Sequence, residues 1–346
     1  MIKIIAKWIA LSLVGLVLGL LLLLGLGSSL SLDRGYHHSS ESRALPLFPR
    51  DSRTSLVRVA ANGFEFRARI AGFESELNEI EKPAVILLHG FPVTSAMWIA
   101  LIDPLLEAGF RVLAFDQRGY SPGARPDKPS EYAVDKLSAD VIAVADAVGI
   151  KRFHLVGHDW GAAVGWATVL LHPERLLSWS ALSIAHPAAF GQALQDDPDQ
   201  QSRSSYFLLF TTPWLPEALF SFNSFSLLQA IYKGMSEKQI SEYIQTFSEP
   251  GALTAALNWY RAMTLGPGTI DDLSLEVEAP TLFVWGNNDP AVGRAAVELQ
   301  RQYLVGPYRN LELDAGHWLL AESPEQTIEA VVQHVTTYRD GIPQRR

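Results

Sequence analysis

Cysteine is absent from this sequence, and its absence removes several kinds of chemistry from consideration. Disulfide bonds, thiolate nucleophiles and metal sites held by cysteine are all excluded. The histidines and carboxylates also lack the spacing typical of a metal site, so we expect neither a metal nor another cofactor. Because a chain without thiols is compatible with any redox compartment, this absence says nothing about where the protein resides.

Clusters of basic residues and internal repeats are missing as well. The 28 basic and 37 acidic residues give a net charge of −9, and no basic patch is dense enough to indicate binding of nucleic acid. We therefore expect a neutral small molecule as the substrate. With 48% apolar residues among 346, the chain can bury a large core, as one large domain or two smaller ones.

One long apolar run stands near the N-terminus, at Trp8–Leu26, after Lys3 and Lys7. The run is long enough to span a bilayer, since about 20 residues at ~1.5 Å each cover the hydrocarbon core. Residues 25–27 (GLG) form a pattern that a signal peptidase could cleave, so residues 1–30 are predicted to be a transmembrane anchor or a signal peptide. Because the run exceeds the usual apolar region of a signal peptide, about 7–15 residues, we favour a single-pass membrane anchor, with export after cleavage as the alternative.

The residues that follow, 31–54, are polar and show no clean periodicity. This composition predicts a tether between the membrane and a folded domain. Arg34 and Arg43 in the tether nearly balance the two lysines before the apolar run, so the orientation of the anchor stays open. The oligomeric state is equally open.

Strands and helices alternate from residue 55 onward, which predicts an α/β fold with a mostly parallel sheet covered by helices on both faces. Residues 56–60 and 64–70 alternate in polarity around the turn 61–63 (ANG), which is typical of a β-hairpin. Further strands are expected at 84–88, 111–115, 153–157, about 178–184, 280–285 and 309–313, and helices near 95–108, 135–148 and 160–172.

Residues 188–268 interrupt this alternation. They contain no convincing buried strand, and their many aromatic residues show helical spacing. An inserted helical unit within an α/β domain is best interpreted as a cap over the strand ends. We therefore expect a helical cap at 188–268, between two parts of one core at 55–187 and 269–346.

An aspartate occupies the centre of a motif that lifts a nucleophile out of a sheet. Residues 157–161 (GHDWG) follow an apolar strand and open an apolar helix, with Gly157 and Gly161 two positions on either side of Asp159. This is the layout of a nucleophile elbow, whose crowded strand-to-helix turn glycines tolerate. An ionised carboxylate needs no base to attack, and its product with a carbon electrophile is an alkyl ester.

Two later strand ends supply partners for Asp159. Asp289 follows the strand at 280–285, and His317 follows the strand at 309–313. Because sites form at the carboxyl ends of parallel strands, we expect Asp159 as nucleophile, Asp289 as acid and His317 as base. Asp314, three residues before His317, is the less favoured alternative for the acid.

The strand at 84–88 ends in residues 89–92 (HGFP), where Gly90 allows a sharp turn. Backbone N–H groups near Phe91 could then point into the site. Together with the N–H of Trp160, they would form an oxyanion hole with two donors.

Four motifs occur in a fixed order, each at an expected strand end: HGFP at 89–92, GHDWG at 157–161, GNNDP at 286–290 and AGHW at 315–318. In this order they resemble the α/β-hydrolase superfamily, and specifically its epoxide hydrolase branch. The resemblance runs from about residue 62 to the C-terminal helix. It implies the α/β-hydrolase fold and a hydrolase that uses an aspartate.

The resemblance also implies two tyrosines in the cap. Opening an epoxide at neutral pH needs an acid near the leaving oxygen, and tyrosine, with an ordinary pKa of about 10, stays protonated there. Tyr206, which precedes the Phe-x-x-Pro stretch 210–213, matches the first position, although Thr211 stands where the family often has glutamine. Tyr260, within 258–261 (NWYR), matches the second without change. Tyr232 and Tyr243 are fallback candidates.

The sequence therefore predicts that water and a small apolar epoxide give a vicinal diol through an alkyl ester on Asp159. A haloalkane dehalogenase would share Asp159, His317 and Trp160. Such enzymes often have an asparagine after HG, where this chain has Phe91. A protein that binds a ligand under the cap without turnover is the alternative from another class, and the presence of all three triad residues argues against it.

Overall fold

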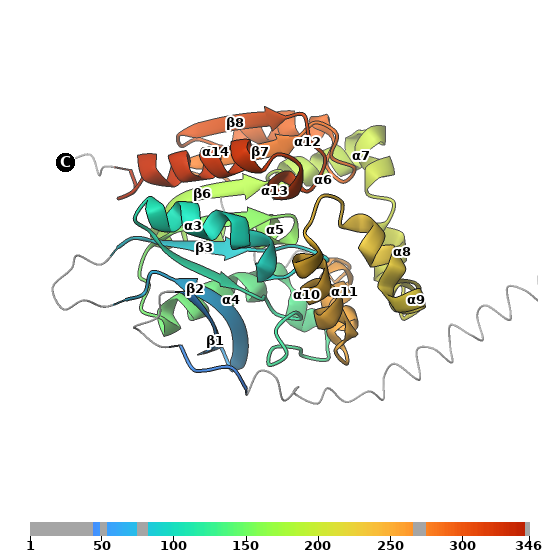
Figure 1. Ribbon diagram of the computed structural model, residues 1–346. Coiled ribbons are helices and arrows are strands. Elements are labelled where there is room, and N and C mark those ends of the chain that lie inside the picture. Colours follow the sequence, from blue (N-terminus) through green and yellow to red (C-terminus); the bar gives the residue numbers. More distant parts are fainter. Residues whose placement is uncertain (1–43, 49–53, 75–81, 266–274, 343–346) are drawn as a thin grey trace, which may run out of the picture.

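An eight-stranded sheet forms the centre of the computed structural model, which describes residues 44–48, 54–74, 82–265 and 275–342 (Figure 1). The strand order is β1-β2-β4-β3-β5-β6-β7-β8. Strands β3 to β8 are parallel, and β2 pairs antiparallel with both β1 and β4. The predicted α/β fold with a mostly parallel sheet is confirmed. The strands are β1 (Thr54–Ala61), β2 (Phe64–Ala71), β3 (Ala84–Leu88), β4 (Arg111–Phe115), β5 (Phe153–His158), β6 (Leu176–Leu182), β7 (Thr281–Gly286) and β8 (Tyr308–Leu313).

Helices cover both faces of the sheet, as Figure 1 shows. Helices α3 (Ile99–Glu107) and α14 (Pro324–Thr337) pack together on one face, and α4 (Val134–Ala147) and α5 (Trp160–Leu171) pack together on the other. The short helices α12 (Arg294–Leu299) and α13 (Leu319–Glu322) follow β7 and β8. Strands β3, β5 and β6 are buried along their whole length. Covering on both faces explains why they are largely apolar instead of alternating.

The local turn chemistry agrees with the sequence at the first hairpin and differs from it elsewhere. Asn62 and Gly63 both have positive φ angles, 49° and 78°, as a two-residue turn between twisted strands requires. The helix expected near 95–108 is divided into a 3₁₀ turn, η1 (Ser95–Trp98), and α3. The Oγ1 of Thr94 accepts the N–H of Ala96 at 3.3 Å and so caps the 3₁₀ turn.

Part of the predicted tether is attached to the sheet. The N–H of Phe48 donates to the carbonyl of Arg58 at 3.1 Å, and the N–H of Arg58 donates to the carbonyl of Pro46 at 2.8 Å. The ring of Phe48 also packs edge-on against Phe73, with centroids 5.1 Å apart. Residues 44–48 therefore bind the outer edge of β1, whereas residues 31–43 and 49–53 of the predicted tether lie outside the described residues. Periodicity cannot reveal a contact made by so few residues.

Between β6 and β7, the described residues form helices. These are α6 (Pro187–Asp196), α7 (Pro198–Arg203), α8 (Phe207–Thr211), α9 (Leu215–Ile231), α10 (Glu237–Ser248) and α11 (Ala252–Met263). Figure 1 shows α8 to α11 beside the carboxyl ends of the central strands. The exact limits of the cap stay a prediction, because residues 266–268 lie outside the described residues.

The 44–342 region, apart from its gaps at 49–53, 75–81 and 266–274, contains no helix long and apolar enough to cross a bilayer. The predicted span Trp8–Leu26 lies outside the described residues. The predicted anchor is therefore not part of what the structure describes.

Helix α5 lies close against the sheet because two of its positions are glycine. A Cβ at Gly161 would lie 2.0 Å from the carbonyl oxygen of Leu88, and a Cβ at Gly165 would lie 1.9 Å from Cη2 of the fully buried Trp179. Any larger residue at these positions would have to push the helix away from the strands. Since Asp159 directly precedes this helix, the same contacts fix the position of its side chain.

Replacing Gly165 with alanine should lower the free energy of unfolding by about 1–3 kcal/mol, the usual cost of overpacking a core. The added methyl group would overlap the indole of Trp179, which is buried and cannot move away. Midpoints of thermal and urea unfolding measure the effect.

Gly191→Ala is the matched control, since Gly191 lies in α6 and a Cβ there would meet no atom of another part of the chain within 4 Å. Alanine favours a helix by roughly 1 kcal/mol over glycine, so this variant should be as stable as the parent or more stable. Equal losses in the two variants would contradict the packing argument.

Candidate active site

Asp159 stands at a sharp turn between β5 and α5. Its backbone has φ 53° and ψ −124°, a conformation that costs a non-glycine residue about 1–3 kcal/mol. Gly157 and Gly161 make this turn feasible, because a Cβ at Gly157 would lie 2.4 Å from the carbonyl oxygen of Gly161. Asp159 is 6% exposed, and it directly follows β5 at the carboxyl edge of the sheet.

The loop after β3 binds one oxygen of this carboxylate. The backbone N–H of Phe91 donates to Oδ1 of Asp159 at 2.7 Å. A Cβ at Gly90 would lie 2.3 Å from the same oxygen, so only glycine lets the carboxylate approach this loop. The other expected donor, the N–H of Trp160, belongs to the first residue of α5. Its role in an oxyanion hole stays a prediction.

His317 lies between two carboxylates that come from different strands. Its Nε2 is 3.5 Å from Oδ2 of Asp159, and its Nδ1 is 2.9 Å from Oδ2 of Asp289. The second oxygen of Asp289 accepts the N–H groups of Ala291 at 2.7 Å and Val292 at 3.2 Å. The structure thus brings together the three residues that the sequence selected, from the ends of β5, β7 and β8.

The competing acid, Asp314, is placed elsewhere. It is exposed, and its Oδ1 accepts a hydrogen bond from Nδ2 of Asn288 at 2.9 Å. Asp289 is fully buried and contacts His317 directly. Of the two carboxylates, Asp289 is therefore the one positioned to orient the imidazole.

Charges within this group shift the pKa values of its members. Burial by itself would raise the pKa of Asp289, but the charge of His317 and hydrogen bonds from His317 and Ser183 lower it to about 2. Burial would lower the pKa of His317, yet Asp289 and Asp159 raise it to about 10. In the absence of substrate, an imidazolium therefore lies between two carboxylates at neutral pH.

Ser183 is a member of the site that the sequence did not reveal. Its hydroxyl donates to Oδ2 of Asp289 and lies 3.1 Å from Nδ1 of His317. It directly follows β6 and has a φ of 78°, which turns the chain sharply at the edge of the sheet. The sequence signal was a polar residue at a strand end, but the strand was predicted to continue to residue 184, which placed Ser183 inside it.

His158 supports His317 from behind. Its Nε2–H donates to the backbone carbonyl of His317 at 2.8 Å, and the two ring centroids are 4.7 Å apart. Burial lowers the pKa of His158 to about 4, so this ring is neutral and carries a single N–H. That hydrogen bond holds the loop after β8 against the strand that precedes Asp159.

The two cap tyrosines, Tyr206 and Tyr260, lie near each other and near the carboxylate of Asp159. Tyr260, on α11, has its ring centroid 5.0 Å from that of Trp160 and 5.5 Å from that of Phe91. The rings of Tyr206 and Tyr260 are 6.1 Å apart, although 54 positions separate them in the chain. Burial raises the pKa of both hydroxyls, and the negative charge of Asp159 raises both further. Both tyrosines are therefore protonated donors at neutral pH.

Arg261 fixes the helix that carries Tyr260. Its guanidinium donates to the carbonyl of Thr212 at 3.0 Å, and to Oδ1 of Asn258 at 3.2 Å. It also forms an ion pair with Glu217 of α9 at 2.9 Å. These contacts join α11, which carries Tyr260, to the residues that follow α8, and so restrict movement of Tyr260 relative to Tyr206.

The fallback tyrosines have structural surroundings. The hydroxyl of Tyr232 donates to the carbonyl of Pro92 at 2.6 Å, and Tyr243 packs beside Tyr232 with centroids 5.2 Å apart. Both rings are buried. The hydrogen bond from Tyr232 ties the cap to the loop that carries Phe91.

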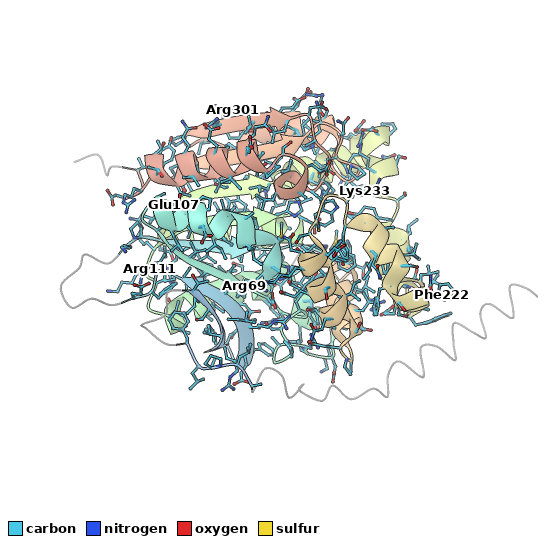
Figure 2. All side chains as sticks on the ribbon, viewed as in Figure 1. Arg69, Glu107, Arg111, Phe222, Lys233 and Arg301 are labelled. Carbon is cyan, nitrogen blue, oxygen red and sulfur yellow. The ribbon has the colours of Figure 1, made fainter. Side chains whose placement is uncertain are left out.

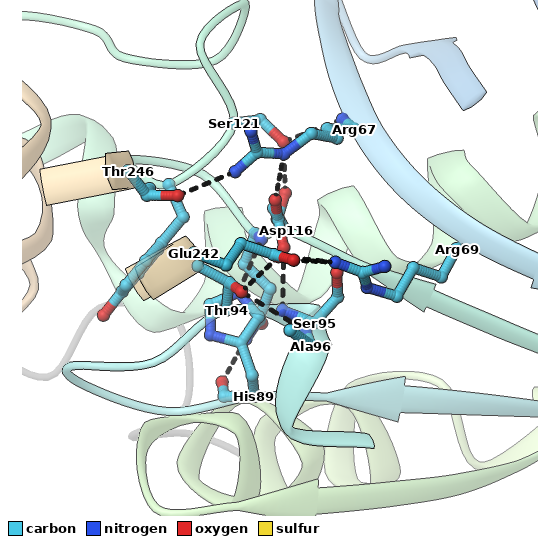
Figure 3. A network of polar contacts seen from close by, with 12 residues as sticks. Arg67, Arg69, His89, Thr94, Ser95, Ala96, Asp116, Ser121, Glu242 and Thr246 are labelled. Carbon is cyan, nitrogen blue, oxygen red and sulfur yellow. Dashed lines mark hydrogen bonds and ion pairs between the residues drawn. The ribbon is translucent and has the colours of Figure 1, made fainter. Parts of the chain in front are cut away.

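A buried polar network joins the same loop to the sheet (Figure 3). Asp116, just after β4, accepts the N–H of Ser95 at 2.7 Å and forms an ion pair with Arg67 of β2. Burial would raise the pKa of Asp116, but the charge of Arg67, together with His89, the N–H of Ser95 and Arg69, outweighs this effect and holds the pKa well below its usual range. Arg67 also donates to Oγ1 of Thr246, on α10, at 3.0 Å.

Glu242 adds a second connection from α10. It pairs with Arg69 of β2 and accepts a hydrogen bond from Oγ1 of Thr94 at 2.9 Å, as Figure 3 shows. Through these contacts, the loop that contains Phe91 is bound on one side by the sheet and on the other by the cap. Among the described residues, no group of three or more histidine, aspartate or glutamate side chains could hold a metal ion.

Comparison with known proteins agrees with this fold. The sequence model of a family described as "alpha/beta hydrolase fold" matches residues 83–324. Epoxide hydrolase 4 of Homo sapiens is 31% identical over 284 residues, covering 78% of this chain and 75% of that protein. Epoxide hydrolase A of Mycobacterium tuberculosis is 32% identical over 321 residues, covering 80% and 96%.

Among solved structures, that of Epoxide Hydrolase A from Mycobacterium thermoresistibile is similar, with a TM-score of 0.68 and 28% identity. The match covers 82% of this chain and 98% of that one. The family match over most of the chain, and relatives above 30% identity, show that this chain belongs to the alpha/beta hydrolase fold family and resembles its epoxide hydrolases.

Proposed function

We propose that the protein hydrolyses an apolar epoxide to a vicinal diol through an alkyl ester on Asp159. One observation carries this proposal: an aspartate at the nucleophile elbow faces two protonated tyrosines of the cap, and a His317–Asp289 pair lies beside it. A carboxylate can attack carbon, the tyrosines can protonate an oxygen, and the histidine can activate water. The two relatives named epoxide hydrolases support the same reaction.

The first step forms the ester. Oδ1 of Asp159 is held by the N–H of Phe91, which leaves Oδ2 as the attacking oxygen. An electron pair of Oδ2 forms a bond to one ring carbon while the C–O bond of the epoxide breaks. Tyr206 or Tyr260 gives its proton to the released oxygen and becomes a tyrosinate. In-line attack requires the proton donor to lie on the side of the epoxide opposite the attacking carboxylate.

Esterification then changes the charge balance around His317. The negative charge of Asp159 contributes to raising the pKa of His317, and the ester is neutral. The pKa of His317 therefore falls when the ester forms, and its proton can pass to the tyrosinate. This transfer restores the tyrosine and leaves the imidazole neutral, as a general base must be.

The second step breaks the ester. Neutral His317, oriented by Asp289, takes a proton from water, and the resulting hydroxide attacks Cγ of Asp159. The negative charge that develops on Oδ1 is stabilised by the N–H of Phe91. Collapse returns the carboxylate and releases the diol, with the second proton of the water on its new hydroxyl. One epoxide and one water are consumed, and His317 is again an imidazolium.

Two alternatives remain to be compared with this reaction. A haloalkane dehalogenase would use the same aspartate and histidine, but a halide leaves without a proton, so it would not need the two tyrosines. A protein that only binds a ligand would not need His317 to reach both carboxylates. Release of chloride or bromide without diol formation from an aromatic epoxide would favour the dehalogenase.

We also propose that Trp8–Leu26 is retained as a single-pass anchor, because it is uncharged and about as long as a bilayer is thick. A cleaved signal peptide is the alternative. Apolar epoxides partition from water into membranes, so an anchored hydrolase would lie close to its substrate.

His317→Gln should trap the ester, because glutamine cannot take a proton from water. Intact-mass measurement after mixing with an epoxide should show the His317→Gln protein heavier by the mass of the substrate. The double variant His317→Gln/Asp159→Asn should show no added mass. The parent protein, in water labelled with heavy oxygen, should incorporate the label into Asp159 during a single turnover.

His172→Gln is the matched control, since His172 lies at the far end of α5 from Asp159. It should turn over normally and accumulate no ester. A diol that carries all of the heavy oxygen after the first turnover would rule out the covalent route.

Tyr260→Phe and Tyr206→Phe should each slow ester formation by about 10²-fold, the lower range for loss of a general acid, and the double variant should be slower still. Each substitution removes only a hydroxyl, so the packing of both rings is kept. Stopped-flow fluorescence of the tryptophans beside the site measures the rate.

Tyr338→Phe, at the end of α14, is the control and should behave as the parent. Full activity of the double variant on an epoxide would remove the cap tyrosines from the mechanism.

The rate of ester hydrolysis should rise with pH and then become constant. His317 must be neutral in this step, and it stays protonated up to about pH 10 in the free enzyme because Asp289 and Asp159 raise its pKa. Loss of the charge on Asp159 lowers this pKa, so the midpoint of the rise should lie below 10. Single-turnover decay of the ester at a series of pH values tests this, and a rate that falls as pH rises would contradict it.

A further inference from the structure

Large apolar side chains are exposed mainly on the cap. In the part of the chain that the structure describes, ten such side chains are exposed, and six of them lie in the cap: Leu208, Leu219, Phe222, Leu227, Met263 and Leu265. Leu208 is 79% exposed and Phe222 is 72% exposed. We call Leu208, Leu219, Phe222 and Leu227, on α8 and α9, the cap apolar surface. Figure 2 shows Phe222 at the outer edge of the molecule, away from the sheet.

The segment that carries this surface is almost free of charge. Between Arg203 and Lys233, Glu217 is the only residue of the Asp, Glu, Lys and Arg types, whereas these types make up 19% of the whole sequence. Glu217 is neutralised by its ion pair with Arg261 at 2.9 Å. The cap apolar surface therefore has no charged side chain with which to attract a charged partner, or to keep an apolar medium away.

The backbone of α9 is bent so that Phe222 points outward. Residues 223–225 all have left-handed backbone angles, with φ of 47°, 54° and 63°, and none of them is glycine. Such backbone angles are strained for residues other than glycine. Phe225 packs back against the core, while Phe222 is left in solvent. Transfer of Phe222 into an apolar medium would be favourable, because it would remove the exposed ring from water.

A lipid surface fits these features better than a protein does. Exposed apolar side chains on the outer edge of a protein can enter the boundary between headgroups and acyl chains. The chain also carries the 19-residue apolar run Trp8–Leu26. Residues 27–43 separate this run from the described part, and a chain of that length can span at most about 60 Å. With a net charge of −9, the protein would be repelled by anionic lipids, so the surface suits neutral ones.

We propose that the cap apolar surface docks onto a neutral lipid bilayer and lets apolar substrates pass from the membrane to the site beneath the cap. Helix α8 connects the two regions. Leu208 is exposed on this helix, whereas the ring of Phe210 packs on that of Phe91 with centroids 5.5 Å apart. Tyr206 is the residue immediately before the helix. The docking itself does not depend on the proposed function. Only the identity of the substrate as an epoxide rests on the proposed function.

The absence of cysteine allows a direct test with single labels. Leu208→Cys, Phe222→Cys and, as a control, Glu325→Cys on the exposed side of α14 are made in the full chain and labelled with an environment-sensitive fluorophore. The proteins are reconstituted into phosphatidylcholine vesicles, with and without spin-labelled lipid. All three positions are exposed, so folding should be unaffected, and circular dichroism checks this.

Labels at positions 208 and 222 should show blue-shifted emission and be quenched several-fold by spin-labelled lipid, without dependence on salt. The label at position 325 should show neither effect. Retention of the protein in the vesicles under alkaline carbonate tests the anchor in the same preparation.

Two results would overturn the docking proposal. Emission at 208 and 222 that matches position 325 would show that the cap stays in water. A blue shift without quenching by lipid would show that another protein surface covers the cap, either a second copy or a segment of this chain. Since the measurement needs no turnover, a lack of epoxide hydrolysis would leave its outcome unaffected.

Finally, Leu208→Ser/Phe222→Ser should raise the apparent KM for an epoxide dissolved in vesicles several-fold and leave the kcat/KM for a water-soluble epoxide unchanged. Equal changes for both substrates would show a general effect on the enzyme and contradict the entry route from the membrane.

Discussion

The strained backbone at Asp159 is the constraint on which the rest of the site depends. A residue with φ 53° at the junction of β5 and α5 is held there by backbone-to-backbone contacts that only glycines at 157 and 161 allow. Gly90 extends the same crowding to the neighbouring loop, so that the N–H of Phe91 meets Oδ1. Because these are contacts of the main chain, the carboxylate has a fixed place and direction before any substrate arrives.

Charge is the second feature that organises this site. His317 is held as an imidazolium by two carboxylates, and Asp289 is held ionised by His317, Ser183 and two backbone N–H groups. In the proposed reaction, one of these three charges disappears when the ester forms. The group that must become a base is thereby released from part of the attraction that kept it protonated, so the order of the two steps follows from electrostatics.

The helices of the cap contact the site on one side and are exposed on the other. Inward, Tyr206, Phe210 and Tyr260 form an aromatic cover around Phe91 and Trp160. Outward, the same α8 and the bent α9 expose Leu208 and Phe222. Contacts of Glu242, Thr246 and Tyr232 with the core tie the cap to the loop that positions Phe91. These contacts therefore link the outer surface of the cap to the loop whose Phe91 N–H binds Asp159.

The sequence by itself determined the fold, the elbow and the order of Asp159, Asp289 and His317. These depend on local signals, namely glycines at sharp turns and polar residues after apolar strands, and parallel strands necessarily bring their carboxyl ends to one edge. Only the tertiary structure decided that Asp289 and not Asp314 contacts His317, that Ser183 joins them, and that residues 44–48 bind β1. It also decided that Tyr206 and Tyr260 meet, and that α9 bends to expose Phe222. Such contacts join residues far apart in the chain, and packing between whole helices and strands sets their distances, so no local pattern could encode them.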